Sequence, residues 1–313
     1  MPAILDGSAT AREIKSEITA HLGELREAGI QPGLAAVLVG ENPASAIYVR
    51  SKVQACADLG LYSRKIELPG TLSTMDLLTQ IELLNKDDAI DGILVQLPLP
   101  PQINSRMILH AVDPQKDVDG FHPINVGKLC ANLPGLRPCT PAGVMELLRR
   151  SRIDIEGRNA VVIGRSDIVG KPLALLLLHQ NATVTVCHSK TADLAGVCRR
   201  ADLLFAAIGR AGLVTPDFVK PGAVLVDVGQ NVITDRVKAE SFFGGTSRME
   251  TFDKKGSLLM GDIHPKAFEM SSAYTPVPGG VGPLTIAMLM VNTVQAALVR
   301  RGESIALRAV RPG

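Results

Sequence analysis

Short apolar runs alternate with amphipathic segments along this 313-residue sequence, and this alternation restricts the folds open to it. The expected strands lie at 34–40, 63–69, 91–100, 159–164, 182–189, 202–209 and 223–229, and each of the last four follows a polar turn and ends in glycine or serine. Apolar runs of this length fit strands buried on both faces. Strands that alternate with helices imply right-handed crossovers and a mainly parallel sheet. The sequence therefore predicts an α/β protein built of two α/β domains around a cleft.

The last four runs follow the order of a Rossmann-like dinucleotide-binding domain. We expect this domain to cover residues 148–275, and a catalytic domain to combine residues 1–147 with 276–313. The apolar helix expected near 283–301 has no strand after it, so it is expected to return to the first domain. Between 113 and 141 the regular pattern fades, which indicates a functional or connecting loop.

Composition excludes several classes of function. The net charge is +2 and only 3% of residues are aromatic, so no nucleic-acid partner is expected. The longest aliphatic run, 172–178, is too short to span a bilayer, and the N-terminus lacks the pattern of a signal peptide. Five cysteines without C-x-x-C spacing fit reduced thiols, so we expect a cytoplasmic protein with no membrane partner. The histidines show no metal-ligand spacing and no metal is expected, while a solvated basic tail is expected to hold Arg300, Arg301, Arg308 and Arg311.

A possible phosphate-binding turn follows the strand expected at 159–164. Gly164 permits a tight turn, Gly170 permits close packing of helix on strand, and Ser166 replaces the middle glycine of the usual motif. Free amides at the start of the next helix would face a pyrophosphate. The turn therefore predicts dinucleotide binding by Gly164, Arg165 and Ser166.

The end of the next strand indicates which dinucleotide is bound. NAD enzymes usually place a carboxylate there for the ribose 2′-hydroxyl, but this sequence has His188, Ser189 and Lys190. Ser189 can donate a hydrogen bond to a 2′-phosphate, and Lys190 and Arg165 can supply positive charge. NADP is therefore preferred to NAD, although both cations are also compatible with ordinary solvated surface residues.

Candidate substrate residues lie in the first domain and in a glycine-rich loop. Tyr48 and Lys52, four residues apart in "AIYVRSK", share one helix face, which is common at any helix surface. Gln96 ends the strand at 91–100, where it could either meet a ligand or satisfy local backbone. In "KDVDGF", Asp117 or Asp119 could accept a ligand's donors, and the loop 275–285 ("TPVPGGVGPLT") would let backbone approach a flat ligand closely.

Taken together, the chain resembles the bifunctional methylenetetrahydrofolate dehydrogenase/methenyltetrahydrofolate cyclohydrolase family. The resemblance covers almost the whole length. It is carried, in order, by "YVRSK" (48–52), "GILVQLPLP" (92–100), "DPQKDVDGFHPINVGKL" (113–129), "PCTPAGVMELL" (138–148), "VVIGRSDIVGKPLA" (161–174), "ATVTVCHSKT" (182–191), "GDI" (261–263) and "TPVPGGVGPLTIAML" (275–289).

The resemblance implies a role for each candidate. Lys52 would be the catalytic lysine that takes a proton from water, Tyr48 its partner at the folate, Gln96 the side chain that tunes the lysine, and Asp119 the acid that binds the pterin. It also implies NADP as cofactor, a homodimer, and a place in one-carbon metabolism that supplies purine biosynthesis. The remaining positions that it implies are Leu97, Pro98, Pro278, Gly279 and Gly280 for the substrate, and Gly164, Arg165, Ser166, Ser189 and Gln230 for the cofactor.

Two stretches depart from the family pattern. Position 230, in "DVGQN", is glutamine where the family typically has isoleucine, so a backbone contact would survive but apolar packing on nicotinamide would not. The stretch 232–260 is longer than the expected hairpin, and we expect a surface insertion.

Other classes of protein fit less well. A short-chain dehydrogenase would place its Tyr-x-x-x-Lys after the glycine turn, and a shikimate-type dehydrogenase would not explain "TPVPGGVGPLT". A monofunctional dehydrogenase and a non-catalytic binder of NADP or folate remain as alternatives.

Overall fold

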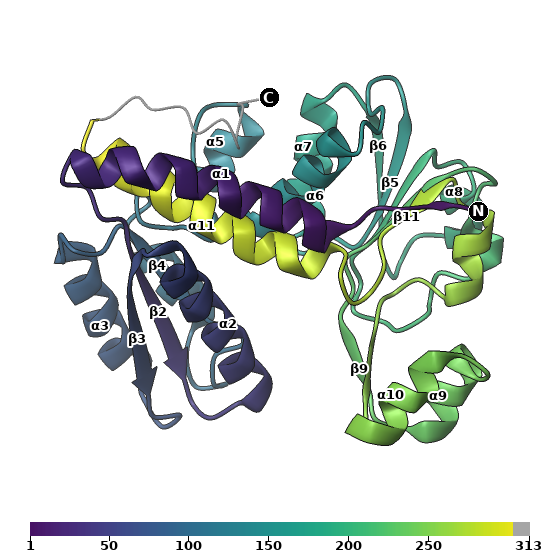
Figure 1. Ribbon diagram of the computed structural model, residues 1–313, viewed down its shortest axis with the longest axis horizontal. Helices are drawn as coiled ribbons and strands as arrows, with labels where there is room; N and C mark the ends of the chain where they lie inside the picture. Colours follow the sequence, from purple (N-terminus) through teal and green to yellow (C-terminus); the bar gives the residue numbers. More distant parts are fainter. Residues whose placement is uncertain (303–313) are drawn as a thin grey trace. The chain divides into compact units, whose positions relative to one another are not determined.

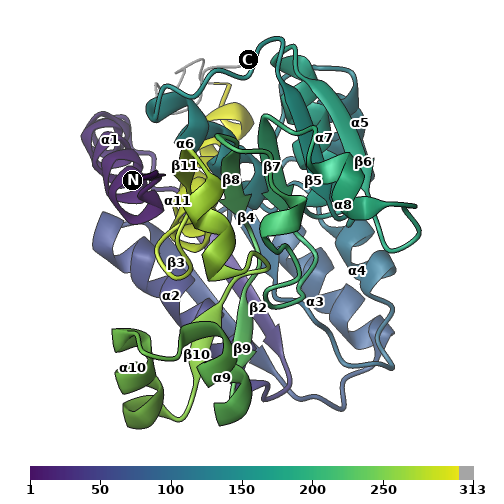
Figure 2. The same cartoon turned by 90° about the vertical axis from the view of Figure 1, so that its right-hand side faces the viewer.

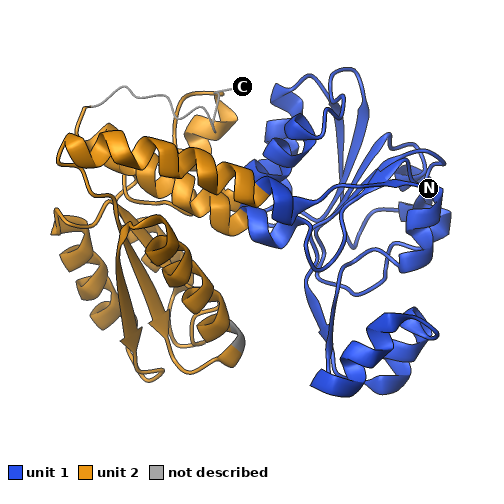
Figure 3. Cartoon of the chain, in the orientation of Figure 1, with its two compact units in different colours: residues 1–10, 140–284 blue, residues 11–139, 285–313 orange. Residues whose placement is uncertain are grey.

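The computed structural model describes residues 1–302, apart from the side chain of Ala44, and divides into two compact units (Figure 3). Unit 1 comprises residues 1–10 and 140–284, and unit 2 comprises residues 11–139 and 285–313, of which 303–313 lie outside the described residues. Two α/β units, one with a Rossmann-like parallel sheet, confirm the predicted fold class. The unit boundaries differ from the predicted ones, since residues 1–10, 140–147 and 276–284 all belong to unit 1.

Unit 1 is built on a six-stranded parallel sheet (Figure 1) in the order β1-β11-β8-β7-β5-β6, of which Figure 2 labels the last five strands. Its apolar core includes Ile163, Leu204 and Leu225, all nearly inaccessible to solvent. The elements of this unit are β1 (Ala3–Ile4), α6 (Cys139–Arg150, whose first residue lies in unit 2), β5 (Asn159–Ile163), α7 (Gly170–His179), β6 (Thr183–Cys187), α8 (Leu194–Cys198), β7 (Leu203–Ala206), the 3₁₀ helix η1 (Pro216–Phe218), β8 (Val224–Asp227), β9 (Asn231–Ile233), α9 (Arg236–Phe243), α10 (Ser247–Lys255), β10 (Leu258–Met260), the 3₁₀ helix η2 (Pro265–Met270) and β11 (Ala273–Tyr274).

Unit 2 holds a three-stranded parallel sheet in the order β3-β2-β4. Every residue of β2 is buried, as a central strand requires. A capping box formed by Ser73 and Asp76 begins α3. The elements are β2 (Gly33–Val39), α2 (Pro43–Leu59), β3 (Tyr62–Leu68), α3 (Thr74–Lys86), β4 (Gly92–Val95), α4 (Ser105–Ala111) and α5 (Pro123–Cys130), while α1 (Gly7–Glu27) and α11 (Val281–Arg300) begin in unit 1 and continue in unit 2.

The basic residues at the end of α11 correct the expectation of a solvated tail. Arg300 and Arg301 form ion pairs with the fully buried Asp91, at 2.6 and 2.7 Å. Asp91 also accepts a hydrogen bond from the backbone N–H of Gly33, so these arginines fix the end of α11 within unit 2. Arg308 and Arg311 lie outside the described residues. By length and composition α11 passes the test for a membrane span, but 72% of its most apolar window is buried in the folded chain, as in a core helix.

The stretch 232–260 is a folded hairpin of helices rather than a plain surface loop. Strands β9 and β10 pair antiparallel, and α9 and α10 lie between them in sequence (Figure 2). Phe243 and Phe252 pack with Ile233, Leu258 and Met260 in a separate apolar cluster. The extra length therefore forms a small core of its own.

Candidate active site

Helix α2 presents Tyr48 and Lys52, and its ends are fixed by local signals in the sequence. The side chain of Asn42 accepts a hydrogen bond from the Ser45 N–H at the start, and Gly60 ends the helix with φ of 72°. Tyr48 is 42% exposed, whereas Lys52 is partly buried.

The structure brings Lys52 and Gln96 together. Lys52 Nζ donates a hydrogen bond of 3.0 Å to Gln96 Oε1. The Gln96 backbone N–H donates to the Val37 carbonyl at 2.9 Å, and its Nε2 donates to the Leu97 carbonyl at 2.7 Å. Because its amide nitrogen is occupied by Leu97, Gln96 presents its oxygen to the lysine. Pro98 follows in a cis peptide bond.

The two acids of "KDVDGF" have different roles. Asp117 is 4% exposed and accepts hydrogen bonds from the backbone N–H groups of Phe121 and His122 and from the side chain of Asn125. Asp117 therefore folds the turn. Asp119 accepts no hydrogen bond from any group in residues 1–302, so its carboxylate can receive donors from a ligand.

Burial and charge set the state of Asp119. Desolvation raises the pKa of its carboxyl from 3.8 to about 6, the Lys52 charge opposes this rise, and Asp117 adds to it. The Lys52 ammonium is thus electrostatically coupled to Asp119, which joins the two candidates in one site. At neutral pH the carboxylate is ionised and acts as an acceptor only.

Cys139 and Asn292 support this site, and neither role could be recognised in the sequence. The Asn292 side chain donates to the carbonyls of Val118 and Arg137, at 2.7 and 2.9 Å, and so fixes the residue that precedes Asp119. Cys139 Sγ donates to the Val118 carbonyl at 3.2 Å, and burial raises the pKa of this thiol well above its usual value. The thiol is therefore a structural group.

In unit 1, the predicted phosphate-binding turn follows β5. Gly164 has φ of 125°, and a Cβ there would lie 2.2 Å from the Ala207 carbonyl oxygen. A Cβ on Gly170 would lie 2.2 Å from the Gly164 carbonyl oxygen, so both positions require glycine. Ser166 Oγ accepts hydrogen bonds from the N–H groups of Val169 and Gly170 and caps the start of α7. The close approach of helix to strand, which the sequence predicted, is present.

The end of β6 lies beside this turn, because Cys187 is paired with Ile163 in the parallel sheet. His188 closes the turn by accepting the Lys190 N–H at 3.1 Å through Nδ1. The side chains of Arg165, Ser189 and Lys190 are exposed and pair with no group in the described part of the chain. Two free cations and a hydroxyl, with no carboxylate partner, fit the extra phosphate of NADP.

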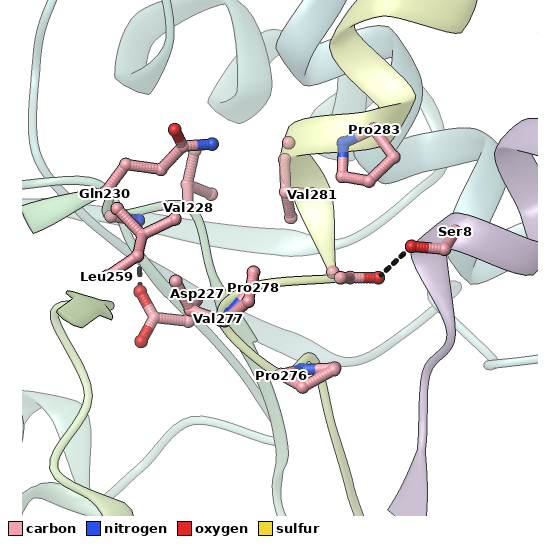
Figure 4. Close-up of a pocket in the computed structure, with 14 residues that line it drawn as sticks. Ser8, Asp227, Val228, Gln230, Leu259, Pro276, Val277, Pro278, Val281 and Pro283 are labelled. Carbon is pink, nitrogen blue, oxygen red and sulfur yellow. Dashed lines mark hydrogen bonds between the residues drawn. The ribbon is translucent and has the colours of Figure 1, made fainter. Parts of the chain in front are cut away.

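A pocket of about 430 Å³ in unit 1 is lined by the glycine-rich loop and by the end of β8 (Figure 4). Pro278, Gly279 and Gly280 form one wall, and Gln230 lies on another. Ser8 donates its N–H to the Gly279 carbonyl at 3.0 Å, which fixes the loop from the start of α1.

Gln230 lies against the first turn of α11. A Cβ on Gly282 would lie 2.6 Å from its Nε2. At this position the pocket therefore presents an amide where the family resemblance led us to expect an aliphatic group, and cofactor binding by Gln230 stays a prediction.

Two buried acids, Asp227 in the lining of this pocket and Asp262, were not among the predicted residues. Asp227 is 1% exposed and accepts hydrogen bonds from the N–H groups of Gly229, Asp262 and Ile263. Asp262 accepts from three successive backbone N–H groups, at 208–210, and from Asn231. Burial raises the pKa of Asp227 to about 7. The motif "GDI" is thus a backbone clamp, visible in the sequence only as a family signature.

Two family models match the chain. One, described as the catalytic domain of tetrahydrofolate dehydrogenase/cyclohydrolase, matches residues 5–119. The other, described as the NAD(P)-binding domain of the same proteins, matches residues 138–301. The chain belongs to the tetrahydrofolate dehydrogenase/cyclohydrolase family.

Relatives support this family assignment over the full length. The bifunctional protein FolD of Koribacter versatilis is 62% identical, with 97% of this chain and 100% of that protein covered. FolD of Solibacter usitatus is 60% identical over 96% of this chain and 99% of the relative. The crystal structure of FolD from Campylobacter jejuni superimposes with a TM-score of 0.87 at 45% identity, covering 96% of this chain and 100% of that one. FolD from Trypanosoma brucei, solved with NADP and an inhibitor, gives 0.86 at 37% identity, covering 97% and 99%.

The family assignment and the geometry agree on the grouping of residues. Tyr48, Lys52, Gln96 and Asp119 fall in the part that matches the catalytic model, whereas Gly164, Arg165, Ser166, Ser189 and Gln230 fall in the NAD(P)-binding part. The role of each individual residue stays a prediction.

Proposed function

We propose that this protein oxidises 5,10-methylenetetrahydrofolate to the 5,10-methenyl form with NADP, and then hydrolyses it to 10-formyltetrahydrofolate. The single observation that carries the second step is the hydrogen bond of Lys52 to Gln96, with Asp119 electrostatically coupled to the lysine. Full-length relatives named as bifunctional FolD support both steps. In this proposal unit 2 carries the folate and proton-transfer residues, and unit 1 carries the cofactor residues.

Asp119 binds the pterin in this proposal. Its carboxylate, which lacks donors within the described chain, accepts two adjacent N–H groups of the ring in parallel. Tyr48 is exposed on the same helix face as Lys52 and packs on the folate. In the same proposal Leu97 and Pro98, which follow Gln96, contact the substrate, and Pro278, Gly279 and Gly280 offer a surface poor in side chains to a flat ligand.

In the first step, NADP supplies the hydride acceptor when it is bound. The chain's contribution is alignment, because the step needs no proton transfer. Gly164 and Ser166 would hold the pyrophosphate, and Arg165, Ser189 and Lys190 would hold the 2′-phosphate. Gln230 would contact the nicotinamide end through its backbone.

In the second step, water attacks the cationic methenyl carbon. The neutral amine of Lys52 takes the proton from the attacking water, and Gln96 orients that amine through its oxygen. The hydroxyl formed on that carbon then loses its proton to solvent, the bond from the carbon to N5 breaks, N5 takes the proton held by Lys52, and the formyl group remains on N10. An ammonium would be repelled by the cationic substrate, which favours the neutral amine at this stage.

Cytoplasmic localisation, a homodimer formed through the nucleotide-binding unit, and a supply of formyl groups to purine biosynthesis are part of the same proposal. They rest on the family resemblance. A cleft between the two domains also stays a prediction.

The decisive test is to incubate the purified protein with 5,10-methylenetetrahydrofolate and either NADP or NAD and to resolve the products with time. We expect NADP to be reduced and the formyl product to appear promptly. Methenyl product that accumulates, and reaches formyl only at the uncatalysed rate, would indicate a monofunctional dehydrogenase. No turnover with either cofactor would favour a non-catalytic binder.

A further inference from the structure

We propose that Arg248, in the extra helical hairpin of residues 234–257, is a positioning residue that holds the glycine-rich loop in place for catalysis. The proposal rests on the proposed function for the role of that loop. It assigns a purpose to a stretch that the family resemblance left unexplained.

The two helices of the hairpin are joined by an ion pair and by apolar packing. Arg236 of α9 forms ion pairs with Glu240 at 3.0 Å and with Asp253 of α10 at 2.6 Å. Beneath these exposed pairs, Phe243 and Phe252 pack in the apolar cluster described above. Because α9 and α10 are held together in this way, a side chain on either helix can fix the position of a neighbouring loop.

Arg248 is the side chain through which α10 contacts the pocket wall. Its Nη1 donates a hydrogen bond of 3.0 Å to the Val277 carbonyl, and its Nη2 donates to the Leu259 carbonyl. The guanidinium carbon lies 4.2 Å from the centre of the Phe243 ring, in cation–π contact. Val277 and Leu259 both line the 430 Å³ pocket, so one guanidinium joins two parts of its wall (Figure 4).

The charged guanidinium of Arg248 is partly buried, which is energetically unfavourable. Burial lowers the pKa of this arginine, and no carboxylate in residues 1–302 pairs with it. Its partners are two backbone carbonyls and one aromatic ring. Burial of a guanidinium without a counter-ion lowers the stability of the fold. We therefore infer that Arg248 serves to position the loop rather than to stabilise the protein.

The loop needs such a support because its own backbone supplies little. Between 276 and 280, the described hydrogen bonds from outside the loop are those of Ser8 to the Gly279 carbonyl and of Arg248 to the Val277 carbonyl. Pro278 has no N–H to donate. The loop is therefore held from α1 on one side of Pro278 and from the hairpin on the other.

The test compares Arg248→Met, Arg248→Lys and a matched control, Arg236→Met, which loses an arginine from the same hairpin without touching the loop. Hydrogen exchange is followed in the peptide that covers 275–284 and in α9 and α10, together with KM and kcat for methylenetetrahydrofolate. In Arg248→Met we expect faster exchange in 275–284, an increase of about tenfold in the folate KM, and kcat within about twofold of wild type. Arg248→Lys, with one donor group, should fall between wild type and Arg248→Met.

Unchanged exchange in 275–284 and an unchanged KM in Arg248→Met would overturn the proposal. An equal rise in KM in Arg236→Met would also overturn it, because it would trace the effect to stability of the hairpin. If Arg248→Met does not fold, the comparison of Arg248→Lys with Arg236→Met decides. If the wild-type protein does not turn over folate, the proposed function is wrong. The hydrogen-exchange measurement still tests whether Arg248 holds the glycine-rich loop.

Discussion

Replacement of Asp119 by asparagine should weaken folate binding and at the same time stabilise the folded protein. The carboxyl pKa is raised from 3.8 to about 6 in the fold, chiefly by burial. A raised carboxyl pKa means that the folded state disfavours the ionised form, so this group lowers stability as pH rises from about 4 to about 6. The shift of roughly two pKa units corresponds to at most about 3 kcal/mol above pH 6. We expect Asp119→Asn to raise the free energy of unfolding by about 1–2 kcal/mol at pH 7.5.

The effect on binding has the opposite sign. The proposed carboxylate makes two charge-assisted hydrogen bonds to the pterin, each contributing about 1.5–3 kcal/mol. Loss of about 3 kcal/mol would raise the folate KM by roughly 100-fold. In wild type, kcat/KM should also fall about tenfold per pH unit below pH 6, because the carboxylate is protonated there. The pH profile of the variant should lack this decrease.

Thermal unfolding at pH 7.5 and pH 4.5 tests the expected gain in stability, and KM over the same pH range tests the expected loss of folate binding. The stability gain should shrink at pH 4.5, where the carboxyl of wild type is largely protonated in the fold. Asp117→Asn is the control: an amide nitrogen at either carboxylate oxygen would face an existing donor, so this variant should be destabilised even though burial also raises the pKa of Asp117. A destabilised Asp119→Asn, or one with the wild-type KM, would refute the reasoning.

Three further changes test other parts of the structure. Lys52→Met should abolish formyl production above the uncatalysed rate while retaining reduction of NADP, which a coupled product assay would detect, and full cyclohydrolase activity would contradict the assignment. Ser189→Asp should lower kcat/KM with NADP by about 100-fold, because a carboxylate would repel the 2′-phosphate, and an unchanged ratio of NADP to NAD activity would contradict that placement. Asp91→Ala should lower the free energy of unfolding by about 3–5 kcal/mol, because it leaves Arg300 without its buried partner at 2.6 Å, and urea denaturation would show whether the loss is this large.

Much of the fold could be predicted because strand and helix periodicity is local. The bounds of α2 and α3 follow from Asn42, Gly60 and Ser73, which are residue types favoured at helix caps. β1 could not be predicted, because two residues carry no periodicity and pair only with β11, some 270 positions away. Helix α5 was missed within the stretch expected to be irregular, although Pro123 after the capping His122 is a recognisable start signal.

The sequence was sufficient to predict which residues form the candidate site, but not which of their side chains contact one another. Tyr48 and Lys52 share a helix face by spacing alone, but the contact of Lys52 with Gln96 depends on β4 lying next to β2, where the Val37 carbonyl fixes Gln96. Arg248 carried no signal in the sequence, since its two carbonyl partners lie 11 and 29 residues away. Contacts of this kind are set by tertiary packing, so local patterns cannot show them.

The acids of the chain show why residue type alone leaves the site ambiguous. Asp117, Asp227 and Asp262 are each buried, and each already accepts at least three hydrogen bonds from its own chain. Such a carboxylate has few acceptor positions left for a ligand and holds backbone instead. Asp119 lies two residues from Asp117 and accepts none from the described chain. From sequence either acid of "KDVDGF" could receive a ligand's donors, and it is the count of donors already present that separates a structural carboxylate from one available to a substrate.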